Sequence, residues 1–288
     1  MTDRRSVLVL GDVMTDVVAH LDRTPVPGSD VPAVISAHGG GSAANAAAWL
    51  SSIGHPTGLI GCVGSDAWGD TAEAELSGAG VITHLSRDPA RATGTCIVIV
   101  GPDGERTMLP DPGANEGLTP GDLPLAEFRT GRHLHLTAYT LLREGSRAAA
   151  LEALALARRA GMTVSVDASS AAPLASAGAD RFLAWVGPAD ILFANEDEAE
   201  VLAGRTLTDL FDVVVVKRGP LGALAHSATG GSWEVPAVPA RARDTTGAGD
   251  AFAGGFLGAW TSGRALRESL EEGASLASRA VAVVGGRP

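Results

Sequence analysis

Short runs rich in β-branched residues alternate with longer stretches rich in alanine and leucine along most of this sequence. Such alternation is typical of repeated strand–helix–strand units, in which the strands form a mostly parallel sheet and the helices cover its faces. We therefore expect an α/β protein with a doubly wound sheet. Ser146 is expected to cap one helix and Gly161 to end it. The expected strands are residues 6–10, 58–63, 133–136, 163–167, 191–194, 213–217 and 222–226, and the expected helices are residues 43–52, 70–78, 146–159, 196–203, 247–261 and 265–283.

Two segments do not follow this alternation. Residues 17–37 are rich in proline, and residues 95–109 (TCIVIVGPDGERTML) contain two strand-like runs around a Pro-Asp-Gly-Glu turn. We expect them to form a small antiparallel sheet that projects from the main body as a lid, built from roughly residues 15–38 and 94–112. No linker or repeat divides the chain, so residues 1–288 are expected to form a single domain.

The charge balance excludes one broad class of partner. The formal net charge is -11, with 22 basic residues against 33 acidic ones, which disfavours a protein that neutralises the phosphates of DNA or RNA. Cys62 and Cys96 lie in apolar runs without the spacing of a metal site or a disulfide framework. No apolar run is long enough to cross a bilayer. We therefore expect a cytoplasmic protein with no nucleic-acid or membrane partner.

The segment DTTGAGD at residues 244–250 is followed directly by the apolar run AFAGGFLGAW. A helix N-terminus carries unpaired N–H groups and a partial positive charge, and glycine lets an anion approach the backbone closely. Gly247, Ala248 and Gly249 therefore form a candidate phosphate-binding turn. Asp250 has two interpretations: it complements the helix dipole, or it is a general base that accepts a hydroxyl proton during phosphoryl transfer.

The common nucleotide-binding motifs are absent. The sequence contains neither G-x-x-x-x-G-K-[ST] nor the H-R-D catalytic loop of protein kinases. GGGSAAN at residues 39–45 does not satisfy G-x-G-x-x-G and does not follow a clear strand, so it does not indicate a dinucleotide site. A nucleotide has to be held by another arrangement.

Several motifs, in order along nearly the whole chain, resemble those of the ribokinase (PfkB-type) family of carbohydrate and nucleoside kinases. The resemblance implies a three-layer αβα ribokinase-like fold, with a mostly parallel central sheet and a small β-sheet lid. The motifs are GDVMTD (residues 11–16), GGSAAN (40–45), GCVGSDAWGD (61–70), NEDE (195–198), VVVKRGPLGA (214–223) and DTTGAGDAFAGGF (244–256), of which the last is the most specific.

The resemblance implies roles at the phosphates. Asp250 would be the catalytic base, and the backbone of residues 247–249 would form an anion hole for the γ-phosphate of ATP. Asn195 would bind phosphate, and Glu198 would hold Mg²⁺ through water, which suits a hard cation that keeps its hydration. The other interpretation of NEDEAE is a solvated acidic helix start with asparagine as its cap.

The resemblance also implies a nucleotide site and an acceptor site. Lys217, Gly219 and Thr245 would contact the nucleotide. Asp244 and Thr246 correspond to residues that ligate K⁺ in some members, so a K⁺ requirement is left open. Substrate hydroxyls would be held by Asp16, Gly40, Gly41 and Asn45, with Asp12 as a further candidate; the other interpretation of Asp16 is an ordinary acidic residue in a turn.

The expected activity is transfer of the ATP γ-phosphate to a hydroxyl of a small sugar or sugar-like molecule, such as ribose, fructose or a 2-keto-3-deoxy sugar acid. Met14 stands where ribokinases usually have a polar residue, which weakens a specific assignment to ribose. The alternatives are an adenosine-like nucleoside kinase and a non-catalytic sugar or nucleotide sensor. A homodimer through the lid is expected, and Arg106 is expected to be a surface arginine of the lid hairpin.

Overall fold

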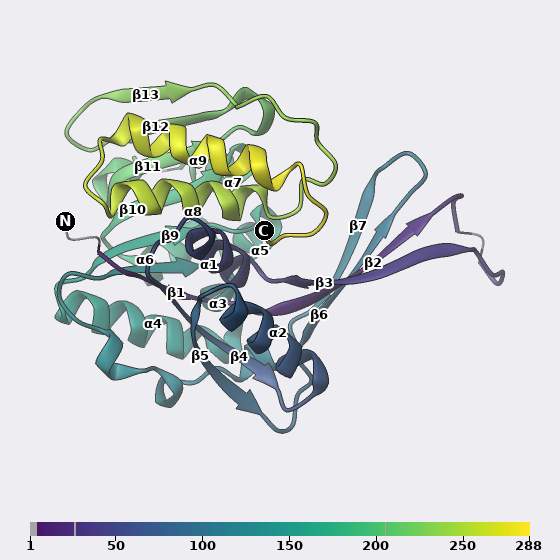
Figure 1. Cartoon of the computed structure of the whole chain (residues 1–288). Coiled ribbons are helices and arrows are strands. Elements are labelled where there is room, and N and C mark those ends of the chain that lie inside the picture. The colour runs from purple at the N-terminus through teal and green to yellow at the C-terminus, as the bar shows by residue number, and fades with distance from the viewer. Residues whose placement is uncertain (1–4, 26, 205) are drawn as a thin grey trace.

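The computed structural model describes residues 5–25, 27–204 and 206–288 (Figure 1). A nine-stranded sheet forms the centre of the molecule, in the order β13-β12-β11-β10-β9-β8-β1-β4-β5. The strands from β11 to β5 are parallel, and β12 and β13 continue the sheet antiparallel. Their bounds are β1 Val7–Leu10, β4 Thr57–Gly64, β5 Ile82–Asp88, β8 His133–Thr137, β9 Thr163–Asp167, β10 Ala189–Asn195, β11 Phe211–Lys217, β12 Ala223–Ser227 and β13 Ser232–Val235.

Helices cover both faces of this sheet (Figure 1). The side chains of Val7 and Val9 pack into the core beneath α1, α2, α8 and α9, whereas Leu8 and Leu10 pack into the core beneath α3 to α7. Successive residues of a strand point to opposite faces, so an uninterrupted apolar run such as VLVL serves both cores. The bounds are α1 Ser42–Ser52, α2 Ala67–Gly78, α3 Tyr139–Leu142, α4 Glu144–Arg159, α5 Ala171–Ala177, α6 Ala179–Val186, α7 Glu196–Leu202, α8 Ala248–Trp260 and α9 Leu266–Ala280.

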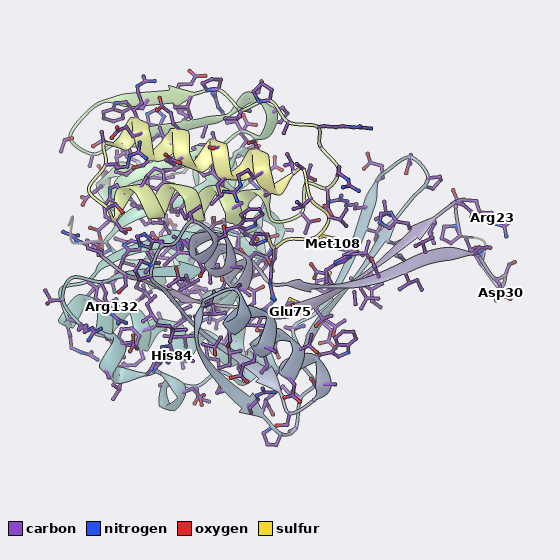
Figure 2. All side chains as sticks on the ribbon, viewed as in Figure 1. Arg23, Asp30, Glu75, His84, Met108 and Arg132 are labelled. Carbon is purple, nitrogen blue, oxygen red and sulfur yellow. The ribbon has the colours of Figure 1, made fainter. Side chains whose placement is uncertain are left out.

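A second sheet of four strands projects from the main body (Figure 1). Its order is β3 (Ala33–Gly40), β2 (Met14–Leu21), β6 (Gly94–Val100) and β7 (Arg106–Asp111). The expected antiparallel arrangement is only partly right, because the central pair β2 and β6 is parallel. These strands follow β1 and β5, which leave the large sheet in the same direction. Figure 2 shows Arg23 and Asp30 at the far end of this projection.

The predicted α/β class, with a mostly parallel sheet and a smaller separate sheet, is confirmed. Two details of α4 and α9 differ from expectation. The helix α4 begins at Glu144, with Arg143 as its cap, and the Ser146 hydroxyl donates instead to the carbonyl of Thr140 at 3.0 Å. The helix α9 stops at Ala280 because the Val281 carbonyl accepts the backbone N–H of Arg243 at 2.7 Å. No helix in the described ranges is long and apolar enough to cross a membrane.

Candidate active site

The first turn of α8 has the geometry of an anion-binding turn. Gly247 precedes it with a φ of 73°, and a Cβ atom there would lie 2.5 Å from the carbonyl oxygen of Gly286, so only glycine fits. The hydrogen bond from the Ala251 N–H to the Gly247 carbonyl opens the helix. The N–H groups of Gly249 and Asp250 precede that bond and have no acceptor within the helix. They are available to an anion at this turn.

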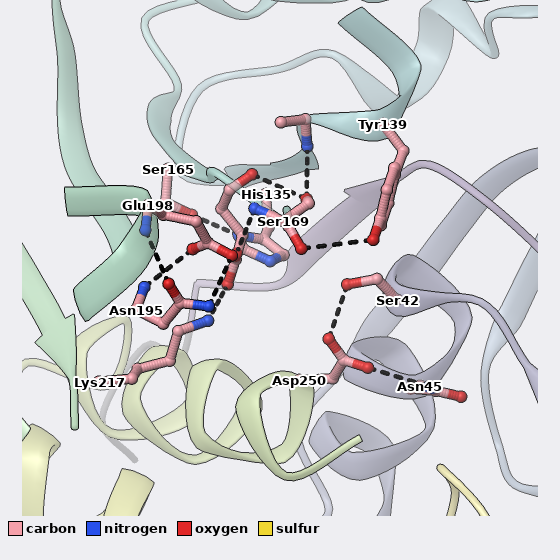
Figure 3. A network of polar contacts seen from close by, with 12 residues as sticks. Ser42, Asn45, His135, Tyr139, Ser165, Ser169, Asn195, Glu198, Lys217 and Asp250 are labelled. Atoms are coloured by element: carbon pink, nitrogen blue, oxygen red, sulfur yellow. Dashed lines mark hydrogen bonds and ion pairs between the residues drawn. The ribbon is translucent and has the colours of Figure 1, made fainter. Parts of the chain in front are cut away.

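Asp250 lies in this turn with both carboxylate oxygens held from α1 (Figure 3). The Ser42 hydroxyl donates to Oδ1 at 2.6 Å, and the Asn45 amide donates to Oδ2 at 2.9 Å. Burial raises the pKa of Asp250 to about 6, although the hydrogen bonds from Ser42 and Asn45 oppose the shift. The residue is therefore poised to take up a proton near neutral pH. Ser42 was not predicted, although it lies inside the GGSAAN motif.

The small sheet contributes Asp16 to the same region. Asp16 does not lie in a turn, as its alternative interpretation had it: it is the third residue of β2, opposite His38 of β3. A Cβ atom on Gly40 would lie 2.4 Å from the Asp16 carboxyl group, which explains glycine at that position. Burial raises the pKa of Asp16 to about 6, and the nearby Arg287 lowers it. No described residue donates a hydrogen bond to this carboxylate.

Asn45 and Asp12 differ in whether their side-chain oxygen atoms already accept hydrogen bonds. The Asn45 Oδ1 atom is buried without a hydrogen-bond partner in the part of the chain that the structure describes. Asp12 instead accepts from the backbone N–H groups of Ser42 and Ala43 and from the Thr137 hydroxyl, at 3.3, 3.4 and 3.3 Å. Asp12 therefore fixes the start of α1, whereas Asn45 and Asp16 present free acceptor atoms.

A cavity of about 600 Å³ lies on the other side of the α8 N-terminus. Its wall is mostly alanine, valine and proline, which suits a flat heterocycle. The structure brings five of the predicted nucleotide and phosphate residues to this cavity, namely Lys217, Gly219, Thr245, Ala248 and Gly249. Asn195 lies next to it, since it pairs with Lys217 in the register of β10 and β11.

Asn195 and Glu198 form a reciprocal cap at the start of α7. The Asn195 side chain accepts the Glu198 N–H at 2.8 Å, and the Glu198 carboxylate accepts the Asn195 backbone and amide N–H groups at 2.8 and 2.9 Å. The helix start is not solvated at Glu198, because this side chain is only 2% exposed. Burial and the nearby Asp167 raise the pKa of Glu198.

Asp167 is a site residue that the sequence did not reveal. It ends β9, and its Oδ2 atom accepts from the Lys217 ammonium at 2.6 Å. The Tyr139 ring stands opposite Ser42 in the same view, and its hydroxyl donates to the Ser169 carbonyl at 3.3 Å. The sequence offers no signal for either contact except that Asp167 ends one buried strand and Tyr139 follows another.

Two arginines tie distant segments to the site. Arg106 of β7 is not a free surface residue: its guanidinium contacts the Asp244 carboxylate at 2.8 Å and the Thr246 hydroxyl at 2.9 Å. Arg287 donates to the Gly40 carbonyl at 2.7 Å. The first contact links the small sheet to the DTTG loop, and the second holds the turn that faces Asp16.

Comparisons with known proteins show the family of the chain. The model of the pfkB family carbohydrate kinases matches residues 4–288. The chain is 36% identical to an ATP-dependent ribose-1-phosphate kinase of Halopiger xanaduensis, over 92% of this chain and 88% of that protein. It is 31% identical to a fructokinase of Escherichia coli, over 87% of this chain and 83% of that protein.

A solved structure is similar over almost the full length. The adenosine kinase from Sinorhizobium meliloti superposes with a TM-score of 0.84 at 25% identity, covering 99% of this chain and 96% of that one. The family model spans nearly every residue that builds the site. The chain therefore belongs to the pfkB family of carbohydrate kinases.

Proposed function

We propose that this protein transfers the γ-phosphate of ATP to a hydroxyl group of a small sugar or sugar-like molecule. Its family consists of phosphotransferases that act on hydroxyl groups. The observation that carries the proposal is the Asp250 carboxylate, whose pKa is raised to about 6 at the start of α8. This arrangement combines a base with free N–H groups for an anion, as phosphoryl transfer requires.

The residues divide the reaction between them. Asp250 accepts the proton of the acceptor hydroxyl as the oxygen of that group bonds to the γ-phosphorus. The bond from phosphorus to the bridging oxygen breaks, and its electron pair leaves with ADP. The N–H groups of Gly249 and Asp250 hold the charge on the transferring group, and Ser42 orients the carboxylate through its 2.6 Å hydrogen bond.

The charges of the site fit a metal that enters with ATP. The carboxylates of Asp167, Glu198 and Asp250 act on the single ammonium of Lys217, so the side chains of the site have an excess of negative charge. A triphosphate adds to that excess, and Mg²⁺ bound with ATP would offset it. No group of three His, Cys, Asp or Glu side chains in the described ranges forms a metal site by itself. We propose that Glu198 and Asn195 hold the ion through water.

Free acceptor atoms favour a polyhydroxylated acceptor. The Asp16 carboxylate and the Asn45 Oδ1 atom both need hydrogen-bond donors, and sugar hydroxyls supply donors. We propose that these two residues, with the backbone of Gly40 and Gly41, select the acceptor. The second candidate is a nucleoside, because the Tyr139 ring stands beside Ser42 and offers a stacking surface (Figure 3). A sensor has no need for a base with a raised pKa.

The proposed K⁺ site at Asp244 and Thr246 has a competitor within the chain. The Asp244 carboxylate already accepts from Arg106, from the Thr246 N–H at 2.8 Å and from the Gly285 N–H at 3.0 Å. The positive charge that an ion brings is thus supplied by the guanidinium. We derive no step through K⁺.

We propose that the small sheet closes over the acceptor as a lid. Asp16 of β2 and Arg106 of β7 lie on the same face of this sheet according to the strand register. Closure places Asp16 on the acceptor and excludes water, which otherwise competes as the phosphate acceptor.

The test is ATP-dependent ADP production with Mg²⁺ against pentoses, hexoses, sugar phosphates, 2-keto-3-deoxy acids and nucleosides. We expect one acceptor class to be turned over, and Asp250→Asn to abolish that turnover. Asp212→Asn, at an exposed position, is the control and keeps wild-type activity. Nucleotide binding without turnover of any acceptor contradicts the proposal and favours the sensor.

A further inference from the structure

Lys217 is the only lysine among the 22 lysine and arginine residues of this sequence. Arginine occupies every other basic position, including partly buried ion pairs such as Arg106 with Asp244. The planar guanidinium of arginine suits pairing with a carboxylate, whereas the lysine ammonium is a compact point charge. An ion pair alone would be served by arginine in this chain. The exception at position 217 indicates that a compact ammonium group is needed there.

The Lys217 ammonium lies where the phosphates of a nucleotide would end. Lys217 is the last residue of β11, its side chain is 15% exposed, and it lines the 600 Å³ cavity. A methyl group built on Gly249 would lie 3.3 Å from its Nζ atom. The ammonium therefore faces the N-terminal turn of α8, whose free N–H groups and Asp250 carry out the proposed transfer.

Asp167 fixes the direction of this ammonium. Its Oδ2 atom accepts from Lys217 at 2.6 Å, and its Oδ1 atom accepts from the Ser169 N–H at 3.0 Å. Ser169 is the only non-glycine residue in the described ranges with a positive φ, of 68°, and its hydroxyl accepts the Ala138 N–H at 2.9 Å. Backbone strain of this kind persists where surrounding structure enforces it, often at functional sites. The turn after β9 thus holds the Asp167 carboxylate against Lys217.

The surroundings of Lys217 keep it charged. Burial lowers the pKa of the ammonium, but the carboxylates of Asp167, Glu198 and Asp250 outweigh that effect and raise the pKa above its ordinary value. His135 also lies nearby, and burial lowers its pKa to about 4, so it is neutral at physiological pH. The group is therefore a permanent cation beside the transferring phosphate.

We propose that Lys217 is a catalytic residue that binds the γ-phosphoryl oxygens of ATP and follows them through the transfer, and that Asp167 is the positioning residue for its ammonium. This inference rests on the proposed function and names the cation of that site. Lys217 neither gains nor loses a proton in the step. The acceptor oxygen bonds to phosphorus, Asp250 takes the hydroxyl proton, and ADP leaves with the electron pair of the broken bond. The ammonium holds the charge on the peripheral oxygens.

A purely structural role makes different predictions. If the pair only tied β9 to β11, Lys217→Arg would preserve it, and any loss would affect ATP and ADP equally. If Lys217 binds the γ-phosphoryl group, Lys217→Arg displaces the positive charge from the γ-phosphoryl oxygens. ATP then binds more weakly, whereas the affinity for ADP is unchanged. The comparison of ATP with ADP therefore separates the two roles.

The experiment measures the dissociation constants of ATP and ADP with Mg²⁺ by calorimetry, and kcat with the acceptor found above. The variants are Lys217→Met and Lys217→Arg. The control is Arg159→Met, whose guanidinium pairs with Glu152 on the same helix, α4. In both Lys217 variants we expect ATP to bind about tenfold to hundredfold more weakly while ADP binds within about threefold of wild type. We expect kcat to fall about 10²-fold to 10³-fold.

Asp167→Asn tests positioning through the same pair of affinities. If Asp167 directs the ammonium to the γ-phosphoryl group, its loss weakens ATP binding and leaves ADP binding within about threefold of wild type. A pair that only ties β9 to β11 would affect the two nucleotides equally.

The outcomes are distinguishable. Equal loss of ATP and ADP affinity, or an unchanged kcat in a folded Lys217→Arg protein, overturns the inference and leaves the proposed kinase function intact. If Lys217→Met does not fold, the Lys217→Arg and Asp167→Asn data decide. Wild-type protein that binds ATP but turns over no acceptor contradicts the proposed function, and the ATP and ADP affinities still test the role of Lys217.

Discussion

Two carboxyl groups with raised pKa values face the acceptor region, one from each side. Burial raises the pKa of both Asp250 and Asp16 to about 6. The nearby Arg287 opposes this increase for Asp16. Both act as carboxylates in the proposed reaction, one as base and one as a hydrogen-bond acceptor for the substrate. Acidification through this region therefore removes both functions together.

We predict that kcat/KM falls steeply below pH 6. If two groups must both be ionised, kcat/KM on the acidic side of the profile falls by up to about a hundredfold per pH unit. If only one group must be ionised, it falls by about tenfold per pH unit. Asp16→Asn should raise KM. It should also reduce the fall of kcat/KM below pH 6 to about tenfold per pH unit, because only Asp250 then titrates. The profile of kcat/KM from pH 4.5 to 8 measures this. A slope that stays the same in Asp16→Asn contradicts the assignment of Asp16.

The raised pKa of Asp250 also has a consequence for stability. A carboxyl group whose folded pKa is about 6, against 3.8 unfolded, binds its proton more tightly in the folded protein. Its charge therefore destabilises the fold at neutral pH, and that penalty disappears as pH falls from about 6 towards 4.

We predict that Asp250→Asn abolishes catalysis and raises the melting temperature at pH 7.5. The gain is at most about 3 kcal/mol, less the loss of hydrogen bonds from Ser42 and Asn45. Thermal unfolding at pH 7.5 and pH 4.5 measures it, and the gain should shrink at the lower pH. A variant that is less stable than wild type at pH 7.5 is inconsistent with this account.

At the scale of the elements, the contact between β7 and the DTTG loop joins the small sheet to the loop that precedes α8. Arg106 is 26% exposed and Asp244 11% exposed, so their ion pair is partly shielded from water. Removing one partner of such a pair leaves a charge that needs another counter-ion. We therefore expect Arg106 to supply the positive charge that a monovalent cation would bring to Asp244.

We predict that wild-type activity depends little on K⁺ and that Arg106→Gln makes it K⁺-dependent. The ion then neutralises Asp244 in place of the guanidinium. The measurement is kcat/KM from 0 to 0.2 M KCl with choline chloride keeping the ionic strength constant, because screening otherwise changes too. Arg91→Gln, whose guanidinium pairs with Asp88, is the control. Equal K⁺ dependence in wild type and Arg106→Gln refutes this role.

At the scale of the whole molecule, the small sheet has one face towards the site and one face uncovered. The register places Ile35, Ile97 and Leu109 on the face opposite to Asp16, and they are 67%, 46% and 51% exposed. An apolar face of this kind marks an interaction surface.

We predict that two copies associate through this face and that Ile97→Glu separates them. Each copy would cover the exposed apolar face of the small sheet of the other copy. The contact would thereby also stabilise the proposed lid. Sedimentation velocity should give a dimer for wild type and a monomer for Ile97→Glu. Ile82→Glu, at a 61% exposed position on β5, is the control and should remain dimeric. A wild-type monomer at micromolar concentration contradicts the prediction.

The architecture and the turn at α8 could be predicted from the sequence. Strand–helix alternation specifies a parallel sheet with two helical layers because each apolar face must be covered, and short motifs such as DTTGAGD act through their own backbone. Gly247, Gly249 and Asp250 lie within one turn, so their relation needs no distant partner.

Only the tertiary structure decided which side chains meet across the site. Asp167 and Lys217 are 50 residues apart, Ser42 and Asp250 are 208 apart, and Arg106 and Thr246 are 140 apart. Local periodicity cannot encode such pairs, because their members come from elements that only the fold brings together; Asp167 and Lys217, for example, end two parallel strands of one sheet. The same folding buries Asp250, Asp16 and Lys217 among particular charges. Their pKa values, and thus their chemistry, are properties of that arrangement rather than of the residue types.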